Sequence, residues 1–354
     1  MISSILRDYG LQLEDCSVET LSTGLINTTW KVNHGEQSFI LQRVNDHVFK
    51  NPYLLAENVD RLDRYLKINA PGYLFVAPLK SSRNEDIVHD PIHGYFRLFP
   101  FIKGSQTINV ADTPSQAFEA AAQFGKFTSL LAEFDTRSLH QTIPDFHNLT
   151  LRYDQFEQAL KYGNSNRVKQ ATELIADIRS HYAVVSSFEE IKKNKDIPLR
   201  VTHNDTKISN VLFDSKGKGI CIIDLDTVMP GYFFSDLGDM MRTYLSPVNE
   251  EEKDFTKIEV REDFFRAIIQ GYLSSMGGNL TLEEKKLIYY SGLFLIYMQA
   301  IRFLADYFNN DSYYGTRYDE QNFVRAGNQL CLLNKLKDKE KEYKKIISTE
   351  LDDE

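Results

Sequence analysis

The sequence predicts an α+β protein in which a small antiparallel β-rich lobe, residues 1–103, precedes a larger and mostly helical lobe, residues 104–354. Two patterns support this division. In the first third of the chain, short segments rich in β-branched and aromatic residues alternate with turn residues. After Gly104, apolar residues recur at helical spacing, apart from one loop-and-hairpin segment at residues 201–231.

The first lobe is expected to form a sheet accompanied by one helix. The segment NHGEQ offers a turn between two strands, and HDPIHG offers another before the last strand. Pro52 suits the first turn of the helix, which is expected at residues 51–68. Strands are expected at residues 17–22, 28–32, 38–44, 73–79 and 95–102.

The second lobe is expected to be built from helices around the hairpin. The charged tail at residues 335–354 is expected to be a solvated helix or a frayed end. The helical periodicity of apolar residues predicts helices at residues 115–134, 152–163, 167–191, 264–276 and 282–308.

Composition and charge exclude several classes of function. The formal net charge is −9, so duplex nucleic acid is not an expected partner. The three cysteines are far apart, which indicates free thiols rather than a disulfide framework or a zinc site. No signal peptide is evident, and the most apolar run, residues 287–301, is expected to be too short to span a bilayer. We therefore expect a cytoplasmic protein without a membrane partner, as a monomer or weak dimer.

The segment HNDTKISN carries the clearest chemical pattern. Its spacing, H-x-D-x-K-x-x-N, is similar to the H-R-D-x-x-x-x-N loop with which protein kinases transfer phosphoryl groups. An Asp suits the proton of the attacking hydroxyl, an Asn oxygen suits Mg²⁺, and a Lys neutralises the migrating phosphoryl group. The His is expected to brace the loop. The residues in these roles are Asp205, Asn210, Lys207 and His203.

A hairpin follows this loop and leads to two further carboxylates. Residues 211–214 and 220–223 are expected to be short strands joined by the turn SKGKG. Because residues two apart on an extended strand point the same way, Asp224 and Asp226 are expected to bind one hard cation. Asp236 lies beyond a Pro-Gly loop and is expected to cap a helix or brace the catalytic loop. The alternative for the whole set is a polar loop with helix-capping Asp residues.

These motifs give the chain a resemblance to the aminoglycoside phosphotransferase and choline kinase superfamily, which shares the protein-kinase-like fold. Within it, the chain is most similar to bacterial N-acetylhexosamine 1-kinases. The resemblance implies that Asp205 is the catalytic base and that Asn210 and Asp224 ligate Mg²⁺. The segments that carry it are STGLINTTWKV, FILQRVNDHVFKNP, FRLFPFIKGS, IPDFHNLTLRY, THNDTKISNVLFD, IDLDTVMPG, DLGDMMR and IRFLADYF.

The resemblance places ATP in the first lobe. STGLIN occupies the position of the glycine-rich phosphate loop, where Gly24, Asn27 and Thr28 cradle phosphate unless the segment is a plain hairpin turn. Gln42 stands where the strand lysine is usual, so either Gln42 binds by hydrogen bonds or another cation takes over. Glu57 matches the helical partner of that lysine, or is a solvated residue. The hinge FPFI matches the segment that binds adenine in kinase-like proteins. Its residues Phe99, Phe101 and Ile102 either contact the nucleotide there or are hydrophobic core at the junction of the lobes.

For the acceptor, the resemblance points to one arginine and two tyrosines. Arg302 lies in an otherwise apolar helix and demands partners; it contacts the sugar, or forms an ion pair with Asp306 at i+4. Tyr313 and Tyr314 line the sugar site, or belong to a surface loop. Arg242 is expected to bind the carboxylates of the segment DLGD.

The resemblance therefore implies an ATP- and Mg²⁺-dependent kinase of the anomeric hydroxyl of N-acetylhexosamines. One alternative is a kinase of another small alcohol, such as an aminoglycoside, homoserine or choline. Arg302 argues against polycationic aminoglycosides. The other alternative is an inactive, nucleotide-binding regulatory protein, which Gln42 and the single-glycine loop favour and the complete set of acidic residues opposes.

Overall fold

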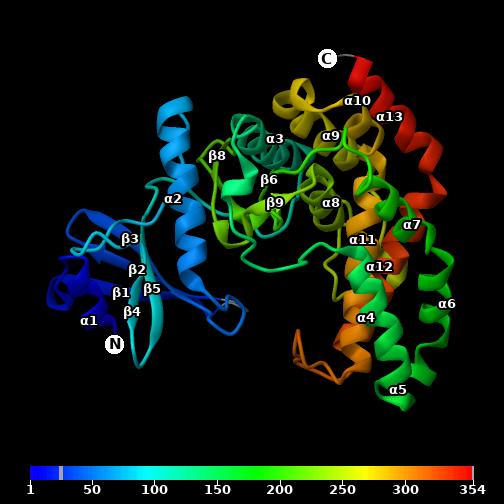
Figure 1. The fold of residues 1–354 in the computed structure, drawn as a ribbon, viewed down its shortest axis with the longest axis horizontal. Helices are drawn as coiled ribbons and strands as arrows, with labels where there is room; N and C mark the ends of the chain where they lie inside the picture. The colour runs from blue at the N-terminus through cyan, green and yellow to red at the C-terminus, as the bar shows by residue number, and fades with distance from the viewer. Residues whose placement is uncertain (24–26, 353–354) are drawn as a thin grey trace. The chain divides into compact units, whose positions relative to one another are not determined.

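The computed structural model describes residues 1–23 and 27–352, which divide into two compact units (Figure 1). Unit 1 comprises Met1–Thr107, Glu133–Pro144 and Leu212–Pro230. Unit 2 comprises Ile108–Ala132, Asp145–Val211 and Gly231–Glu354. Unit 1 thus includes the hairpin and one further segment that the sequence analysis assigned to the helical lobe.

Unit 1 contains an antiparallel sheet with the strand order β1-β2-β3-β5-β4. The strands expected at residues 17–22, 28–32, 38–44 and 95–102 are confirmed, and the predicted α+β class with them. The observed bounds are β1 Cys16–Thr23, β2 Thr28–His34, β3 Gln37–Val44, β4 Val88–Asp90 and β5 Gly94–Pro100.

The strand expected at residues 73–79 is wrong. Its final residue, Leu79, donates one backbone hydrogen bond to Leu98 of β5 (2.7 Å), but Pro78 has no N–H with which to continue a ladder. The edge position beside β5 is taken by β4 instead. Sequence periodicity missed β4 because it lies in a short polar stretch.

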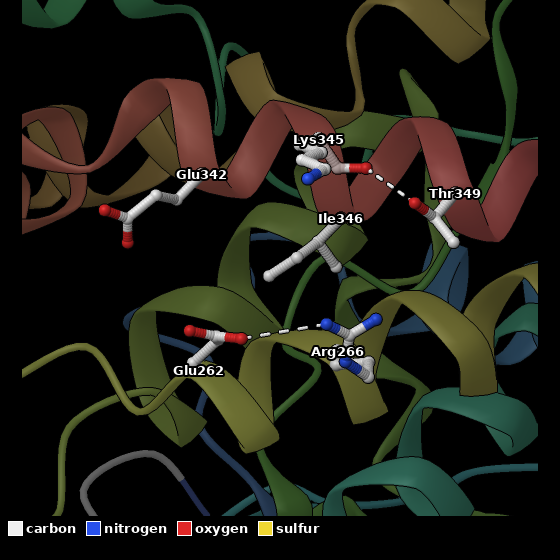
Figure 2. Close-up of a pocket in the computed structure, with 6 residues that line it drawn as sticks. All are labelled: Glu262, Arg266, Glu342, Lys345, Ile346 and Thr349. Carbon is white, nitrogen blue, oxygen red and sulfur yellow. Dashed lines mark hydrogen bonds and ion pairs between the residues drawn. The ribbon is translucent and has the colours of Figure 1, made fainter.

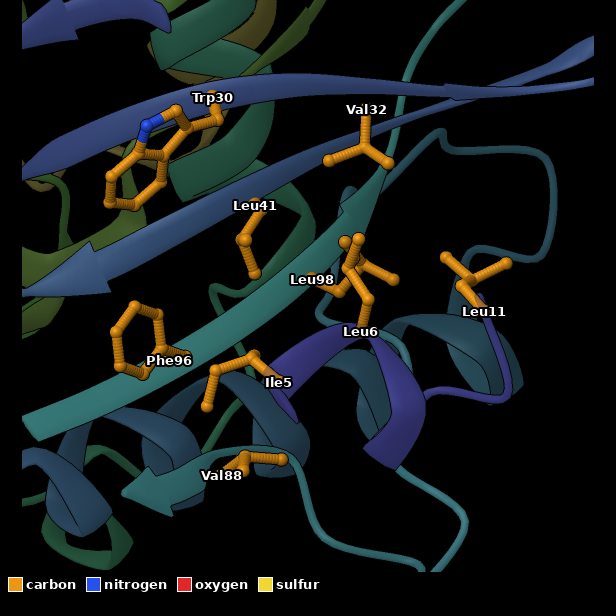
Figure 3. Close-up of a cluster of buried hydrophobic side chains, with 9 residues drawn as sticks. All are labelled: Ile5, Leu6, Leu11, Trp30, Val32, Leu41, Val88, Phe96 and Leu98. Carbon is orange, nitrogen blue, oxygen red and sulfur yellow. The ribbon is translucent and has the colours of Figure 1, made fainter. Parts of the chain in front are cut away.

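One face of the sheet is covered by an N-terminal helix, α1 Ile2–Asp8. Alternate residues of a strand share a face, so β2 presents Trp30 and Val32 together to this helix. Figure 3 shows the cluster, which consists of Ile5, Leu6, Leu11, Trp30, Val32, Leu41, Val88, Phe96 and Leu98. The helix expected at residues 51–68 is confirmed as α2 Pro52–Asn69, with Pro52 in its first turn.

The hairpin is present, but the segment after it is not a strand. β7 Val211–Phe213 pairs with β8 Gly219–Ile222, and the chain then turns at Asp224, whose φ is 62°. A 3-10 helix, η4 Leu225–Thr227, follows. The expectation that Asp224 and Asp226 lie on the same face of an extended strand is therefore wrong: Asp224 is exposed, whereas Asp226 is 3% exposed.

Unit 2 is mostly helical. The helices expected at residues 115–134, 152–163 and 264–276 are confirmed as α3 Pro114–Leu130, α4 Leu149–Tyr162 and α9 Glu262–Met276. The long expected helix at residues 167–191 is interrupted at Ala171 and again at His181 and Tyr182, where the chain turns. The remaining helices are α5 Ser165–Gln170, α6 Thr172–Ser180, α7 Ala183–Ile191, α8 Phe233–Tyr244, α10 Leu282–Lys286, α11 Ile288–Phe308, α12 Gln321–Asp338 and α13 Glu340–Asp352.

Short elements connect these helices and strands. The segment HNDTKISN follows β6 Arg200–Thr202 and ends in η3 Ile208–Asn210, and β9 Met229–Gly231 precedes α8. The other 3-10 helices are η1 Leu13–Asp15, η2 Thr136–Ser138, η5 Phe255–Lys257 and η6 Gly277–Asn279.

Helix α11 forms the core of unit 2, in contact with α4, α8 and α12 (Figure 1). Its 21 residues are long and apolar enough to cross a membrane by length and composition, and 72% of its apolar window is buried inside the protein. The run at residues 287–301, expected to be too short to span a bilayer, thus belongs to a longer helix. Its burial within unit 2 identifies it as a core helix.

The charged tail is a packed helix rather than a frayed end. α13 buries Tyr343, Ile346 and Ile347 and contacts α9. A pocket of about 300 Å³ lies between these helices, and Figure 2 shows the side chains that line it. It is lined by Glu262, Arg266, Glu342, Lys345, Ile346 and Thr349. Arg266 is already paired there, with Glu262 (3.7 Å) and with Glu350 (2.8 Å).

Candidate active site

The catalytic loop after β6 is held in place by the first turn of α8. The Asp236 carboxylate accepts hydrogen bonds from the backbone N–H groups of His203 (2.9 Å) and Asn204 (2.7 Å). The fully buried His203 ring packs edge-on against Phe124 of α3, at 5.1 Å between centroids. Asn204 has a φ of 64°, a conformation that Asn adopts more readily than most residues. The result is a fixed, sharp turn directly before Asp205.

The predicted catalytic residues of this loop lie together. Asp205 Oδ2 lies 3.1 Å from Lys207 Nζ, and it accepts a hydrogen bond from Asn210 Nδ2 at 3.1 Å. The same Nδ2 also donates to the Asp205 backbone oxygen (2.8 Å). The orientation of the Asn210 amide is thereby fixed. Within the described chain, its Oδ1, the atom suited to a cation, accepts no hydrogen bond.

A chain of hydrogen-bonded charged residues supports the loop through the backbone of Thr206. Asp239 accepts a hydrogen bond from the backbone N–H of Thr206 (2.8 Å) and one from Arg242 Nε (2.8 Å). Arg242 also pairs with Glu250 (2.8 Å), and Glu250 accepts a hydrogen bond from Arg325 Nε (3.0 Å). Glu250 and Arg325 were not predicted, because nothing in their sequence neighbourhoods distinguishes them from surface charges.

Burial sets the protonation of these supporting groups. It raises the pKa of Asp236 from 3.8 to about 6, against the opposing effects of His203 and the two backbone N–H groups. Burial also raises the pKa of Asp239, against the effect of Arg242. For Glu250, burial acts in the same direction but is outweighed by Arg242 and Arg325, so its pKa is lowered.

Unit 1 holds a buried polar network at the predicted nucleotide side. Arg97 of β5, 4% exposed, lies opposite Gln42 of β3 in the sheet register. Its guanidinium donates two hydrogen bonds to Gln42 Oε1 (3.0 and 2.5 Å) and pairs with Asp226 Oδ1 (2.5 Å). Asn27 Nδ2 donates to Asp226 Oδ2 (2.7 Å). Arg97 was not predicted as a site residue, because an alternating strand pattern does not identify the partner across the sheet.

The other predicted nucleotide residues have diverse surroundings. Glu57 is paired with Arg61 (3.3 Å) and His140 (2.7 Å), at 51% side-chain exposure. Thr28 is half-buried at the start of β2, and Gly24 lies outside the described residues. Phe99 and Ile102 pack against a cluster of Val76, Leu212 and Cys221, whereas the ring of Phe101 lies under Lys31 (4.3 Å).

The residues predicted to ligate Mg²⁺ are an amide, Asn210, and two carboxylates, Asp224 and Asp226. Among residues 1–23 and 27–352, no group of three or more His, Cys, Asp or Glu side chains suits a metal ion. Mg²⁺ does not require such a cluster, since it typically uses one or two carboxylates together with water and phosphate oxygens. Asn210 Oδ1 in unit 2 and the exposed Asp224 carboxylate in unit 1 are each an oxygen donor of the kind that Mg²⁺ prefers. Asp226 is engaged with Arg97 and Asn27.

The predicted acceptor residues converge in unit 2. The guanidinium of Arg302 in α11 lies over the rings of Phe146 (5.3 Å), Tyr313 (5.8 Å) and Tyr314 (5.5 Å). It hydrogen-bonds Gln299 (3.2 Å) and forms no ion pair with the described carboxylates. The alternative pairing with Asp306 is not realised, because Asp306 accepts from the backbone N–H groups of Tyr313 (2.8 Å) and Tyr314 (3.0 Å).

Two residues that were not predicted, His147 and Arg152, lie beside this cluster, and His147 also contacts the predicted catalytic loop. The side chain of the half-buried His147 hydrogen-bonds Asn204, the neighbour of Asp205. Burial lowers the pKa of His147, as do Arg302 and Arg152. Burial and the charge of Arg302 lower the pKa of Arg152. Arg302 and Arg152 thus place guanidinium groups beside a neutral imidazole.

The sequence profile of the phosphotransferase enzyme family (APH) matches residues 17–275. The chain belongs to this family. The match includes the catalytic loop, the hairpin and the Arg97 network, so these features belong to a phosphotransferase whose acceptor is an alcohol group.

Solved structures of other phosphotransferases share the fold. An amicoumacin kinase in complex with AMP-PNP, Ca²⁺ and Ami is 16% identical, with a TM-score of 0.64 over 94% of this chain and 92% of the other. A microcompartment-associated aminopropanol kinase is 17% identical, with a TM-score of 0.61 over 97% of both chains. A choline kinase from Cryptosporidium parvum Iowa II is 16% identical, with a TM-score of 0.53 over 96% of both chains.

Proposed function

We propose that this phosphotransferase transfers the γ-phosphoryl group of ATP to the anomeric hydroxyl of an N-acetylhexosamine, giving the 1-phosphate. Three of the similar structures bind AMP-PNP, ADP or AMP, which supports an adenine nucleotide as donor. Asp205 accepts or orients the proton of the acceptor hydroxyl, and Lys207 balances charge on the migrating group. Mg²⁺, held by Asn210 and Asp224, supplies charge neutralisation at the phosphates when bound.

The proposed acceptor class rests on the positive charge around Arg302. Aminoglycosides, choline and aminopropanol are cations and need carboxylates or aromatic faces free of competing cations. Here the guanidinium of Arg302 already lies over the aromatic faces of Phe146, Tyr313 and Tyr314, and Arg152 adds a second positive charge nearby. A neutral sugar with hydroxyl and acetamido oxygens satisfies guanidinium donors without charge repulsion. This supports a sugar over a cationic amine.

The test is ADP release by purified protein with Mg·ATP and a panel of acceptors. The panel contains N-acetylglucosamine, N-acetylgalactosamine, glucose, galactose, kanamycin, homoserine and choline, with Asp205→Ala as the blank. Turnover on the N-acetylhexosamines, together with loss of the reducing end in the product, supports the proposal. Turnover on kanamycin or choline alone would discard the sugar and retain the kinase. Nucleotide binding without turnover on any acceptor would favour an inactive regulatory protein.

A further inference from the structure

The buried ion pair of unit 1 does not join the positions at which a kinase of this type is expected to have one. The strand position holds the neutral Gln42, and the helical Glu57 faces solvent with Arg61 and His140 as partners. The buried pair instead joins Arg97 of β5 to Asp226 of η4, and both side chains are 4% exposed. The positive charge expected at the Gln42 position of β3 is therefore found on the neighbouring strand β5, at Arg97.

Gln42 is committed to orienting this arginine. Its Oε1 accepts both Nε (3.0 Å) and Nη2 (2.5 Å) of Arg97, while its Nε2 lies 3.4 Å from Thr29 Oγ1. Both ends of the amide are therefore used inside the sheet. Of the two possibilities that the sequence left open, hydrogen bonding to phosphate by Gln42 or replacement by another cation, the geometry favours the second.

The pair also determines where Asp224 is held. Asp226 is two residues beyond Asp224, and its carboxylate is fixed from two sides, by Arg97 and by Asn27. Its backbone oxygen accepts a hydrogen bond from Thr142 (3.0 Å). Asn27 in turn accepts the backbone N–H of Asn45 (3.0 Å), at the end of β3. These contacts fix the turn in which Asp224 adopts its left-handed conformation.

We propose that Arg97 replaces the strand lysine as the cation of the nucleotide site, and that Asp226 is its counter-ion rather than a metal ligand. Arg97 is a positioning residue: it neutralises Asp226 and fixes the Asp224 turn toward nucleotide and Mg²⁺. This inference rests on the proposed function only in requiring that unit 1 binds a nucleotide; it is independent of the acceptor.

The first measurement is the Kd for Mg·ADP by titration calorimetry, with the melting temperature of the ligand-free protein. Arg97→Met is expected to raise Kd at least tenfold, to raise KM for ATP in parallel, and to leave KM for the acceptor within twofold. Arg64→Met is the matched control, because Arg64 pairs with Asp60 on the exposed face of α2 at 69% side-chain exposure. It is expected to change none of these values.

Two double variants separate positioning from stability. Arg97→Met with Asp226→Asn removes the unpaired buried charge, so the melting temperature should recover while Kd remains weak. Arg97→Met with Gln42→Lys returns a cation to β3 and should recover nucleotide affinity. Wild-type affinity in the first double variant, or no recovery in a folded second one, would overturn the proposal. If the wild-type protein binds no Mg·ADP, the proposed function fails as well.

Discussion

At the scale of single residues, the predicted catalytic loop combines one half-buried acid with several buried supporting groups. The side chain of Asp205 is 21% exposed, whereas His203, Asp236 and Asp239 are buried. This arrangement lets the supporting groups fix the geometry while Asp205 stays accessible to an acceptor. Rate enhancement in a loose phosphoryl transfer comes mainly from such positioning and from charge neutralisation.

Substituting Asp205 by Asn tests its role as base. The amide retains the size of the side chain but cannot accept the proton, so turnover should fall about 10²–10⁴-fold. Nucleotide affinity should change less than twofold, because Asp205 belongs to unit 2 and is not part of the Arg97 network. The exposed Asp154→Asn on α4 serves as the control. A variant that retains more than a tenth of wild-type turnover would contradict the assignment.

The raised pKa of Asp236 predicts a pH-dependent stability. The folded protein holds this proton up to pH about 6, whereas the unfolded chain releases it near 3.8. Because the folded state binds the proton more tightly, the contribution of Asp236 to the free energy of unfolding falls as pH rises between these values. The shift corresponds to at most about 3 kcal/mol.

The comparison variant is Asp236→Asn, which does not titrate. Its stability relative to wild type should improve between pH 4 and pH 7, even though the amide is less stabilising at low pH because it cannot accept both N–H groups of His203 and Asn204. Denaturant unfolding of both proteins at the two pH values measures this difference. A difference that is independent of pH, or that changes in the opposite direction, would show that burial does not dominate the titration of Asp236.

At the scale of elements, the features that the sequence predicted are those determined by residues close together in the chain. The H-x-D-x-K-x-x-N spacing placed Asp205, Lys207 and Asn210 in one loop, and β-rich segments between turn residues located β1, β2, β3 and β5. Contacts between distant segments have no such local signal. Arg97 with Asp226, and Glu250 with Arg325, become partners only when the fold brings together strands and helices that are far apart in the sequence.

Local conformation explains the errors in the same way. Asp224 looked like a strand residue because an apolar run precedes it, but its φ of 62° turns the chain into η4. Residues 73–79 have strand-like composition, yet Pro78 cannot donate to a ladder. Alternation of side chains does not reveal such backbone turns, and the placement of Asp226 depended on one.

The crossing of α3 and α9 relies on two glycines. A Cβ added to Gly271 would lie 2.3 Å from the backbone oxygen of Phe118, and one added to Gly125 would lie 2.6 Å from that of Tyr272. Backbone atoms cannot yield without moving a helix. Gly271→Ala should therefore lower the free energy of unfolding by about 1–3 kcal/mol, as overpacked cores do.

Gly278 offers the matched control for this crossing. A Cβ added there meets nothing within 4 Å, so Gly278→Ala should leave the melting temperature nearly unchanged. Thermal unfolding of the two variants beside wild type gives the comparison. Equal effects of both substitutions would mean that the α3–α9 crossing adapts to an added methyl group.

At the scale of the whole molecule, the proposed binding roles are divided between the two units. Arg97 with its partners, and the hinge residues Phe99 and Ile102, belong to unit 1. Asp205, and Arg302 with the aromatic rings beneath it, belong to unit 2. A ligand that binds only the folded protein adds RT ln(1 + [L]/Kd) to its stability, about 2.7 kcal/mol at a hundred times Kd. Nucleotide and acceptor should therefore each raise the melting temperature, through separate residues.

This division predicts a crossed pattern of variant effects. Arg302→Gln should abolish the melting-temperature increase caused by N-acetylglucosamine and leave the increase caused by Mg·ADP intact. At the same ligand concentrations, Arg97→Met should abolish the increase caused by Mg·ADP and leave the increase caused by N-acetylglucosamine intact, because this substitution weakens nucleotide binding. Mg²⁺ alone is the control for non-specific stabilisation by the cation. If Arg302→Gln removed the response to nucleotide, or Arg97→Met removed the response to the sugar, the two roles would not be separable by unit. The acceptor assignment of Arg302 would then lose its support.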